Sequence, residues 1–233
     1  IDWDEFWNTV NGNGPCNKER LATRVKAHQD GAWVREAALA PMRERLARLG
    51  ILGPQTLAVH AVALNDSDIA LMARHNVHMA HCPTANLKLG SGMAPTSQLQ
   101  AAGINISLGT DGAAGNNRLD LLSEARLAGL LAKGAQQNPG LFPAHSLIYM
   151  ATLGGAHALG LQDQIGSLAI GKRADLCAIA LDSYATLPVF DAASQIIHCA
   201  GREHVTDVWV DGQCVVKKKH LVEISHGEIY AKA

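Results

Sequence analysis

The sequence contains no long apolar run, almost no net charge and no paired cysteines, and each absence argues against a class of protein. No window approaches the roughly 18 to 20 apolar residues of a membrane-spanning helix, so we expect no membrane partner. The 233 residues carry a formal net charge of −1, which gives no electrostatic reason to expect nucleic acid as a partner. The basic run "KKKH" at residues 217–220 is typical of a solvated surface.

The cysteines are scattered and form no CxxC pair, which indicates a reduced, cytoplasmic protein and argues against a cysteine zinc site. They are Cys16, Cys82, Cys177, Cys199 and Cys214. The first ten residues, "IDWDEFWNTV", are acidic and aromatic, so they do not resemble a secretory signal peptide. The composition is instead that of a globular protein with a real core, because 48% of the residues are apolar and 18% are charged.

From residue 56 onward, short apolar runs alternate with amphipathic stretches. The apolar runs "TLAVHAV", "VHMAH" and "INISLGTD" predict buried strands. The stretches "NDSDIALMARHN", "APTSQLQAAG" and "NRLDLLSEARLAGLLAKG" predict helices, the last closed by Gly134. We expect a loop over "CPTANLKLGSGMAP". This order predicts an α/β fold of parallel β–α units, whose sites lie at the carboxyl ends of the strands.

The two ends of the chain differ from this middle part. Residues 1–42 form an atypical N-terminal segment, in which the turn-rich "NGNGPCNKER" precedes a stretch with helical periodicity that we expect to stop at Gly50. The segment from 163 to 233 predicts a small β module. Its clearest feature is "HVTDVWVDGQCVV", two strands joined at Asp211 and Gly212, a strong hairpin signal.

Several polar residues fall at the carboxyl ends of the predicted strands. A carboxylate such as Asp111 at the end of a buried strand must be paired, hydrogen-bonded or metal-bound to stay charged, unless it caps a helix beginning near 116–118. His60 is either a site residue or a core histidine satisfied by a backbone carbonyl. His81 lies at a strand end and is able to line a site. His78 points to the opposite face, so we expect it to be structural or to face outward.

The loop after His81 contains Asn86 and Lys88 among small residues. Such a loop either shapes a pocket or merely turns the chain, and the residues alone do not decide between the two.

Taken together, three motifs resemble the second half of an amidohydrolase-superfamily deaminase. They are "LAVHAV", "HCPTANLKLGSG" and "LGTDGAAGNNRLDLLSEARLAGLLAKG". The resemblance is strongest to the 5-methylthioadenosine/S-adenosylhomocysteine deaminase group, within the wider chlorohydrolase-like set of triazine hydrolases and guanine deaminases. The later segments "MATLGGAHALGLQDQIGSLAIGKRADLCAIAL" and "GREHVTDVWVDGQCVV" resemble the end of that family. The resemblance covers roughly residues 43–220.

The resemblance implies a distorted (β/α)8 barrel with a β-sandwich module. We therefore expect a partial barrel over 43–162. The implied reaction is hydrolytic deamination of a purine nucleoside, with a divalent metal, usually zinc, that activates a water molecule as the nucleophile. Asp111 matches the aspartate that binds the metal and takes a proton from the water. His60 matches the histidine that faces the substrate, and Asn86 is assigned with it to substrate binding.

The chain also departs from the family pattern. It contains no HxH pair, and its only HxxE motif runs from His220 to Glu223, beyond the β module. His28 lies near the expected position of a further ligand but is not followed by xxE. A full barrel needs about 250 residues, so strands 1 to 4 are expected to be missing. Most of the expected zinc site is then absent from this chain.

Two kinds of function therefore remain open. The chain is either part of a metal-dependent deaminase or a catalytically inactive, truncated amidohydrolase. A variant of the first keeps the family but changes the substrate, as in a triazine hydrolase or a guanine deaminase. Because an open barrel leaves unpaired strand edges, we expect the isolated chain to form a homo-oligomer or to use its N-terminal segment as a lid.

Overall fold

The computed structural model describes residues 44–224 and 227. The chain divides into two compact units, residues 1–49 and 50–233. In the first unit, residues 44–48 are helical, and Gly50, with a φ of 68°, follows the helix as predicted. The expectations for residues 1–42, including His28, lie outside the described residues. All further description concerns the second unit.

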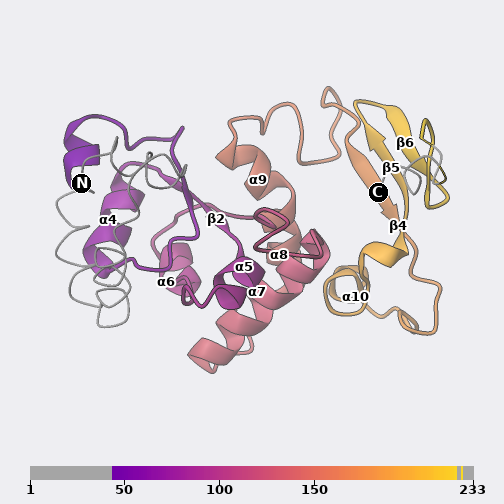
Figure 1. The fold of residues 1–233 in the computed structure, drawn as a ribbon, viewed down its shortest axis with the longest axis horizontal. Helices are drawn as coiled ribbons and strands as arrows, with labels where there is room; N and C mark the ends of the chain where they lie inside the picture. The colour runs from indigo at the N-terminus through magenta and orange to yellow at the C-terminus, as the bar shows by residue number, and fades with distance from the viewer. Residues whose placement is uncertain (1–43, 225–226, 228–233) are drawn as a thin grey trace, which may run out of the picture. The chain divides into compact units, whose positions relative to one another are not determined.

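A parallel sheet lies at the centre of the first part of this unit, as the sequence predicts (Figure 1). Its strand order is β1-β2-β3, with Leu57 opposite His78 and Met79 opposite Ile106. The strands are β1 (Leu57–Val59), β2 (His78–His81) and β3 (Ile106–Leu108). The first strand is shorter than predicted because His60 has a φ of 69°, a left-handed conformation that turns the chain out of the sheet.

Helices follow the strands in the predicted alternation. They are α4 (Asp66–Arg74), α5 (Pro83–Lys88), α6 (Thr96–Ala101), α7 (Leu121–Gln136), α8 (Ala144–Ala151) and α9 (Leu153–Ala158). The expected loop over "CPTANLKLGSGMAP" is partly wrong, because α5 forms there. Pro83 occupies the first helical position, where its fixed φ favours a helix. The expected stop at Gly134 is also wrong, because α7 continues until Gln137 adopts a left-handed φ of 49°.

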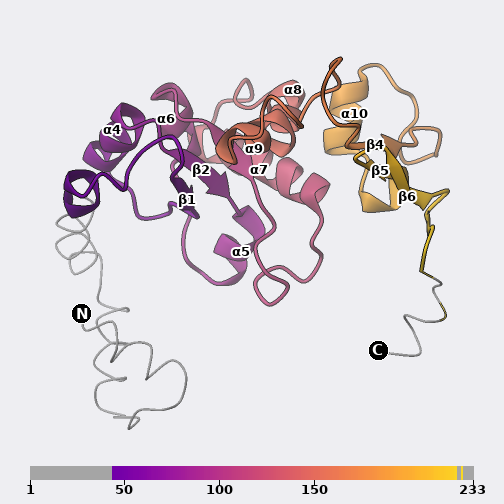
Figure 2. The same ribbon diagram turned by 90° about the horizontal axis from the view of Figure 1, so that it is seen from above.

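The hydrophobic core lies around the parallel sheet. Helices α6, α7, α8 and α9 all contact β3, and α9 also contacts β2; Figure 2 shows these helices and strands from above. The largest apolar side chains with almost no exposure are Met79, Leu99 and Leu147, which come from β2, α6 and α8. Burial of these side chains stabilises the packing of the helices on the sheet.

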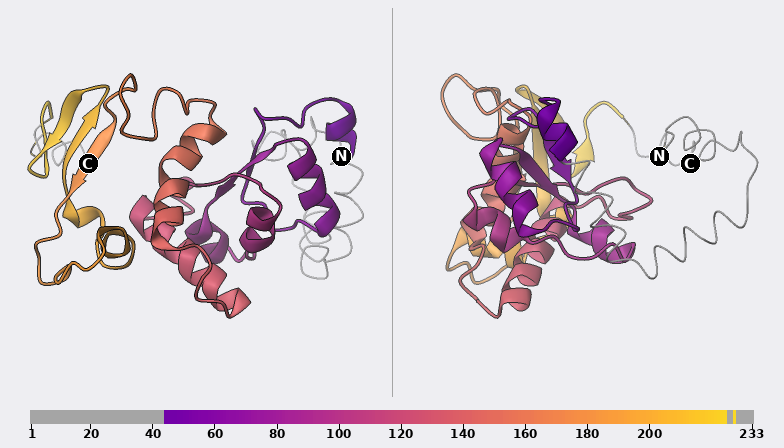
Figure 3. Two further views of the ribbon diagram at one scale, coloured as in Figure 1. Left: turned by 180° about the vertical axis from the view of Figure 1, so that it is seen from behind. Right: turned by 90° about the vertical axis from the view of Figure 1, so that its left-hand side faces the viewer.

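A second, antiparallel sheet follows the core, in the order β4-β5-β6-β7 (Figure 3). Its elements and the helices beside them are β4 (Leu176–Ile179), α10 (Ala192–His198), a 3-10 turn η1 (Arg202–His204), β5 (Val205–Val210), β6 (Gln213–Lys217) and β7 (His220–Leu221). The predicted hairpin is confirmed, because Asp211 and Gly212 join β5 to β6 with φ values of 50° and 79°, as a type I′ turn requires.

One further expectation concerns the basic run in the second sheet. The lysines at 217, 218 and 219 are exposed, which confirms the basic run as a solvated surface.

Helix α10 packs against α7 and α8, and Arg126 Nε donates a hydrogen bond of 2.8 Å to the carbonyl of Ile197. Among the helices that the structure describes, none combines the length and the apolar character that a membrane span requires.

Candidate active site

The carboxyl ends of the three parallel strands bring the predicted site residues to one edge of the sheet. His60 follows β1 directly, His81 is the last residue of β2, and Asp111 lies three residues beyond β3. His60 and Asp111 both have left-handed backbones, with φ values of 69° and 62°. Non-glycine residues adopt this conformation at a cost and often at functional sites. His78, at the other end of β2, lies 3.0 Å from Asn105 instead, as a structural role predicts.

Asp111 faces His60 across the ends of β1 and β3. Its Oδ2 lies 3.7 Å from His60 Nε2, and both side chains are about one-third exposed. The other carboxylate oxygen accepts a hydrogen bond of 2.7 Å from the backbone of Gly112. The alternative that Asp111 caps the following helix is wrong. That helix begins at 121, and Asp120 caps it by accepting from the backbone N–H groups of its first turn.

Asn86, from helix α5, holds the imidazole of His60 from its other side. Its Oδ1 lies 2.8 Å from His60 Nδ1, so the ring donates through Nδ1 and the amide oxygen accepts. In a neutral ring, Nε2 then carries a lone pair directed toward Asp111. At 3.7 Å the two groups are too close for a molecule to lie between them, so they present an imidazole nitrogen and a carboxylate side by side at one edge of the sheet.

His81 lies deeper than His60 and has a different electrostatic character. It is 4% exposed. Burial, together with the positive charge of His60 when it is protonated, lowers the pKa of His81 to about 4. The ring is therefore neutral at pH 7. Neighbouring Cys82 is a poor nucleophile and metal ligand, because burial and the charges of Asp111 and Glu124 raise the pKa of its thiol to about 11.

A buried carboxylate, Glu124 on helix α7, ties the site loops together. It is 1% exposed and accepts hydrogen bonds of 3.0 Å from the backbone of Thr84 and 2.7 Å from the amide of Asn116. It therefore links the start of α5, which carries Asn86, to the loop that carries Asp111. Sequence analysis missed this role. The available signal was an acid on the apolar face of a helix, one turn before Ala128.

Lys88 makes a second link between α5 and the loop after β3. Its ammonium donates 2.8 Å to the carbonyl of Ala114 and 2.5 Å to Oδ1 of Asn117. Gly115 fits close against the carboxylate, since a Cβ there would lie 3.2 Å from Asp111 Oδ2. The loop 111–117 is thus tied to α5. Asn86 of α5 lines a cavity, so the pocket-shaping interpretation of the segment after His81 is favoured over a mere turn.

The described residues do not by themselves fit a catalytic zinc ion. A catalytic zinc takes three protein ligands and a water molecule, whereas His60 and Asp111 offer one nitrogen and one carboxylate. Within residues 44–224 and 227, no group of three or more histidine, cysteine, aspartate or glutamate side chains is placed to hold a metal. His220, of the HxxE motif, lies in β7 of the antiparallel sheet and is exposed.

Comparison with known proteins gives a consistent family. Residues 24–215 match the model of the amidohydrolase family. The 5-methylthioadenosine/S-adenosylhomocysteine deaminase of Teredinibacter turnerae is 43% identical over 200 residues, which cover 86% of this chain and 45% of that protein. An adenosine deaminase from Xanthomonas campestris with bound zinc is similar with a TM-score of 0.79 and 42% identity, over 81% of this chain and 43% of its own.

A zinc complex of atrazine chlorohydrolase from Arthrobacter aurescens is also similar. Its TM-score is 0.76 at 32% identity, over 80% of this chain and 42% of its own. The chain thus spans less than half of the length of these three relatives. The match to the family model and the shared α/β fold with a parallel sheet lead to one conclusion: the chain belongs to the amidohydrolase family.

Proposed function

We propose that this chain is part of a metal-dependent hydrolytic deaminase that acts on a purine nucleoside of the 5-methylthioadenosine/S-adenosylhomocysteine type. The observation that carries the proposal is the placement of Asp111, His60 and Asn86 at the carboxyl edge of the parallel sheet. The 43% identical relative bears the name of that deaminase. A cytoplasmic location fits a small-molecule substrate of this kind.

The proposed architecture is a partial (β/α)8 barrel over residues 43–162 with a β-sandwich module over 163–233, preceded by the atypical segment 1–42. The parallel order β1-β2-β3 supports the first part, and the antiparallel order β4-β5-β6-β7 supports the second. In a barrel, active sites lie at the carboxyl ends of the strands. His60 and Asp111 lie at such ends here.

Each of the three residues has a proposed chemical role. Asp111 accepts the proton of the attacking water, because its carboxylate is part-exposed at the site edge. His60 faces the substrate and helps to polarise the attacked ring carbon. The proton that Asp111 takes from the water passes to the amino group, which departs as ammonia. Asn86 holds the His60 imidazole in one orientation through its Oδ1 and contributes to substrate binding. The arrangement places the proton acceptor and the substrate-facing group 3.7 Å apart at one edge of the sheet.

Zinc is the proposed metal, since two related structures contain it. When bound, zinc lowers the pKa of a coordinated water and so supplies hydroxide near neutral pH. Asp111 is the described residue proposed as a ligand. At least two more ligands would have to come from outside the described residues, because those residues alone do not make a zinc site.

The test uses the full chain, with metal content and ammonia release as separate measurements. The proposal expects about one zinc ion per chain after dialysis, and ammonia release from 5-methylthioadenosine or S-adenosylhomocysteine. Asp111→Asn is expected to abolish the release. The matched control is Asp163→Asn, since Asp163 is exposed and has no proposed role. Ammonia release that persists in Asp111→Asn would contradict the proposed role of the carboxylate.

A second candidate function is a catalytically inactive amidohydrolase fragment. One observation favours it: the described residues offer no three-ligand metal group. Near-zero zinc and no ammonia release from the full chain would favour this candidate. Chloride release from atrazine would instead favour a triazine hydrolase. The proposed homo-oligomer is checked on the same sample by its mass in solution.

A further inference from the structure

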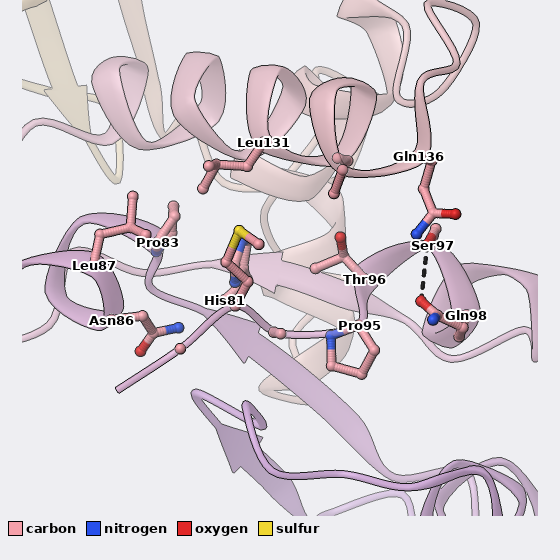
Figure 4. A pocket seen from close by; sticks show the side chains of 15 residues that line it. His81, Pro83, Asn86, Leu87, Pro95, Thr96, Ser97, Gln98, Leu131 and Gln136 are labelled. Atoms are coloured by element: carbon pink, nitrogen blue, oxygen red, sulfur yellow. Dashed lines mark hydrogen bonds between the residues drawn. The ribbon is translucent and has the colours of Figure 1, made fainter. Parts of the chain in front are cut away.

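A buried carboxylate on helix α7 is bonded to both segments that carry the candidate active site. Glu124 is 1% exposed. One of its oxygens accepts from the start of α5, and the other accepts from the loop that precedes α7. Helix α5 packs against α7, and Figure 4 shows Pro83 and Leu87 of α5 beside Leu131 of α7. Two chains of hydrogen bonds lead from this one carboxylate to the site.

The first chain of contacts runs through α5 to His60. Oε2 of Glu124 accepts a hydrogen bond of 3.0 Å from the backbone N–H of Thr84, in the first turn of α5. Asn86 follows two residues later, and its Oδ1 accepts 2.8 Å from His60 Nδ1. Because α5 has only six residues, its position depends on such anchors more than on its own helical stability. Release of Thr84 would therefore move the acceptor that orients His60.

The second chain of contacts runs through the loop after β3 to Asp111. Oε1 of Glu124 accepts 2.7 Å from Nδ2 of Asn116, which is itself 1% exposed. The backbone N–H of Asn116 donates 2.9 Å to the carbonyl of Gly112, and the N–H of Gly112 donates 2.7 Å to Oδ1 of Asp111. The side-chain oxygen of Asn116 accepts from two backbone N–H groups further along the loop. Asn116 therefore fixes the backbone turn that holds the Asp111 carboxylate.

We propose that Glu124 and Asn116 are positioning residues, which together set how Asp111 stands against His60. The inference rests on the proposed deaminase function, in which those two groups serve the water and the substrate. Glu124 acts through Asn86 on one side and through Asn116 on the other. A carboxylate suits this place because it only accepts hydrogen bonds, so it satisfies both donors at once, whereas an amide would turn one N–H toward a donor.

An exchange of the two side chains tests this pairing. Glu124→Gln sets an amide N–H against the N–H of Thr84 or of Asn116. Asn116→Asp sets two carboxylates against each other. The double variant, Glu124→Gln with Asn116→Asp, restores every bond with donor and acceptor reversed. The amide nitrogen at position 124 then donates to the carboxylate at 116, and the amide oxygen accepts from Thr84.

The first measurement is the ¹⁵N spectrum of the His60 ring in the full chain, at a pH high enough to keep the ring neutral. The unchanged chain is expected to carry the proton on Nδ1, because Nδ1 donates to Asn86. Each single variant is expected to show a mixture of both tautomers, and the double variant is expected to regain the Nδ1–H form. The matched control is Gly129→Ala on the same helix, whose added Cβ would press on Leu147. It destabilises the fold but should leave the ring unchanged.

The second measurement is ammonia release from 5-methylthioadenosine. Each single variant is expected to lower kcat by about 10- to 100-fold, as displaced catalytic groups do, and the double variant is expected to restore it. A ring that is unchanged in both single variants would overturn the proposal. So would a folded double variant with mixed tautomers, a result that decides even if the single variants do not fold. If the unchanged chain releases no ammonia, the deaminase function fails, whereas the ring spectra still decide how His60 is positioned.

Discussion

Asn86 and His60 lie 26 residues apart in sequence, yet Oδ1 of the amide is 2.8 Å from Nδ1 of the imidazole. Asn86 is buried on helix α5, whereas the side chain of His60 is 39% exposed on a turn that follows β1. The buried amide of Asn86 therefore fixes the orientation of the exposed imidazole of His60. The orientation of His60 toward Asp111 thus depends on a buried residue of α5.

This relationship predicts energetic coupling between the two side chains. We expect a double-mutant cycle of His60→Ala and Asn86→Ala, measured by urea unfolding, to give a coupling energy of about 1 kcal/mol. The control cycle pairs His60→Ala with Asn138→Ala, since Asn138 is exposed and bonds locally to Gly140. In that second cycle, the two changes in the free energy of unfolding are expected to add. Additivity in both cycles would show that the contact does not orient His60.

Glu124 is expected to be more important for stability than its charge alone suggests. Glu124→Ala leaves two donors, the backbone of Thr84 and the amide of Asn116, without their acceptor. Removing the acceptor of buried donors should lower the free energy of unfolding by about 2 to 4 kcal/mol. Glu124→Gln keeps one oxygen and should cost less. The measurement is urea unfolding monitored by circular dichroism.

The control for Glu124 is Glu203→Gln, because the side chain of Glu203 is 64% exposed. An exposed position of this kind should change the free energy of unfolding by less than about 0.5 kcal/mol. If Glu124→Ala were equally mild, the buried carboxylate would not be what holds the start of α5 to the loop of Asp111.

The lowered pKa of His81 predicts how the stability of the fold depends on pH. Burial, then the charge of His60, lowers its pKa in the folded state to about 4, whereas the ordinary value is about 6.5. Between these two values the unfolded chain binds a proton that the folded chain does not. Stability therefore falls as the pH falls from about 6.5 to 4, by up to about 3 kcal/mol from this residue.

Urea unfolding at several pH values checks the prediction for His81. In His81→Phe the slope between pH 6.5 and 4 should flatten, since the group that takes up the proton is gone. His145→Phe, the same substitution at an exposed residue, should keep the slope of the unchanged chain. A slope that is identical in all three proteins would show that other groups dominate the acid range.

The edge of the sheet that carries the site was predictable, because it depends on periodicity. Apolar runs alternating with amphipathic stretches predict parallel strands, and parallel strands place residues such as His60 and Asp111 at one edge. The three long motifs were enough to indicate the family. Contacts made by α5 were not predictable. Its sequence, "PTANLK", has too few apolar residues for a helical pattern, and its packing against α7 depends on tertiary contacts.

The details within the site were also beyond the sequence. The stop expected at Gly134 failed because a glycine inside a helix costs only about 1 kcal/mol, and the residue whose left-handed backbone ends α7 is Gln137. Asp120 rather than Asp111 caps that helix. Because both acids lie near its predicted start, the sequence alone does not distinguish them. Only the backbone path, with the left-handed turn at Asp111, separates the residue that caps from the residue that faces His60.

Two glycines of helix α7 provide a matched pair for the last prediction. At Gly129 a Cβ would lie 2.7 Å from Cδ1 of Leu147, a buried side chain of α8. At Gly134 no described atom lies within 4 Å of the same position. Gly129→Ala should therefore overpack the contact between α7 and α8 and lower the free energy of unfolding by about 1 to 3 kcal/mol.

Gly134→Ala should do the opposite. Gly134 lies inside the helix with open space around it, so alanine adds helix propensity without a clash and should raise the free energy of unfolding by about 0.5 to 1 kcal/mol. Thermal unfolding of the two variants beside the unchanged chain measures both effects. Because the substitution and the helix are the same, a difference in sign isolates the contact with Leu147. Equal effects at both positions would mean that α7 and α8 do not approach each other as closely as Gly129 allows.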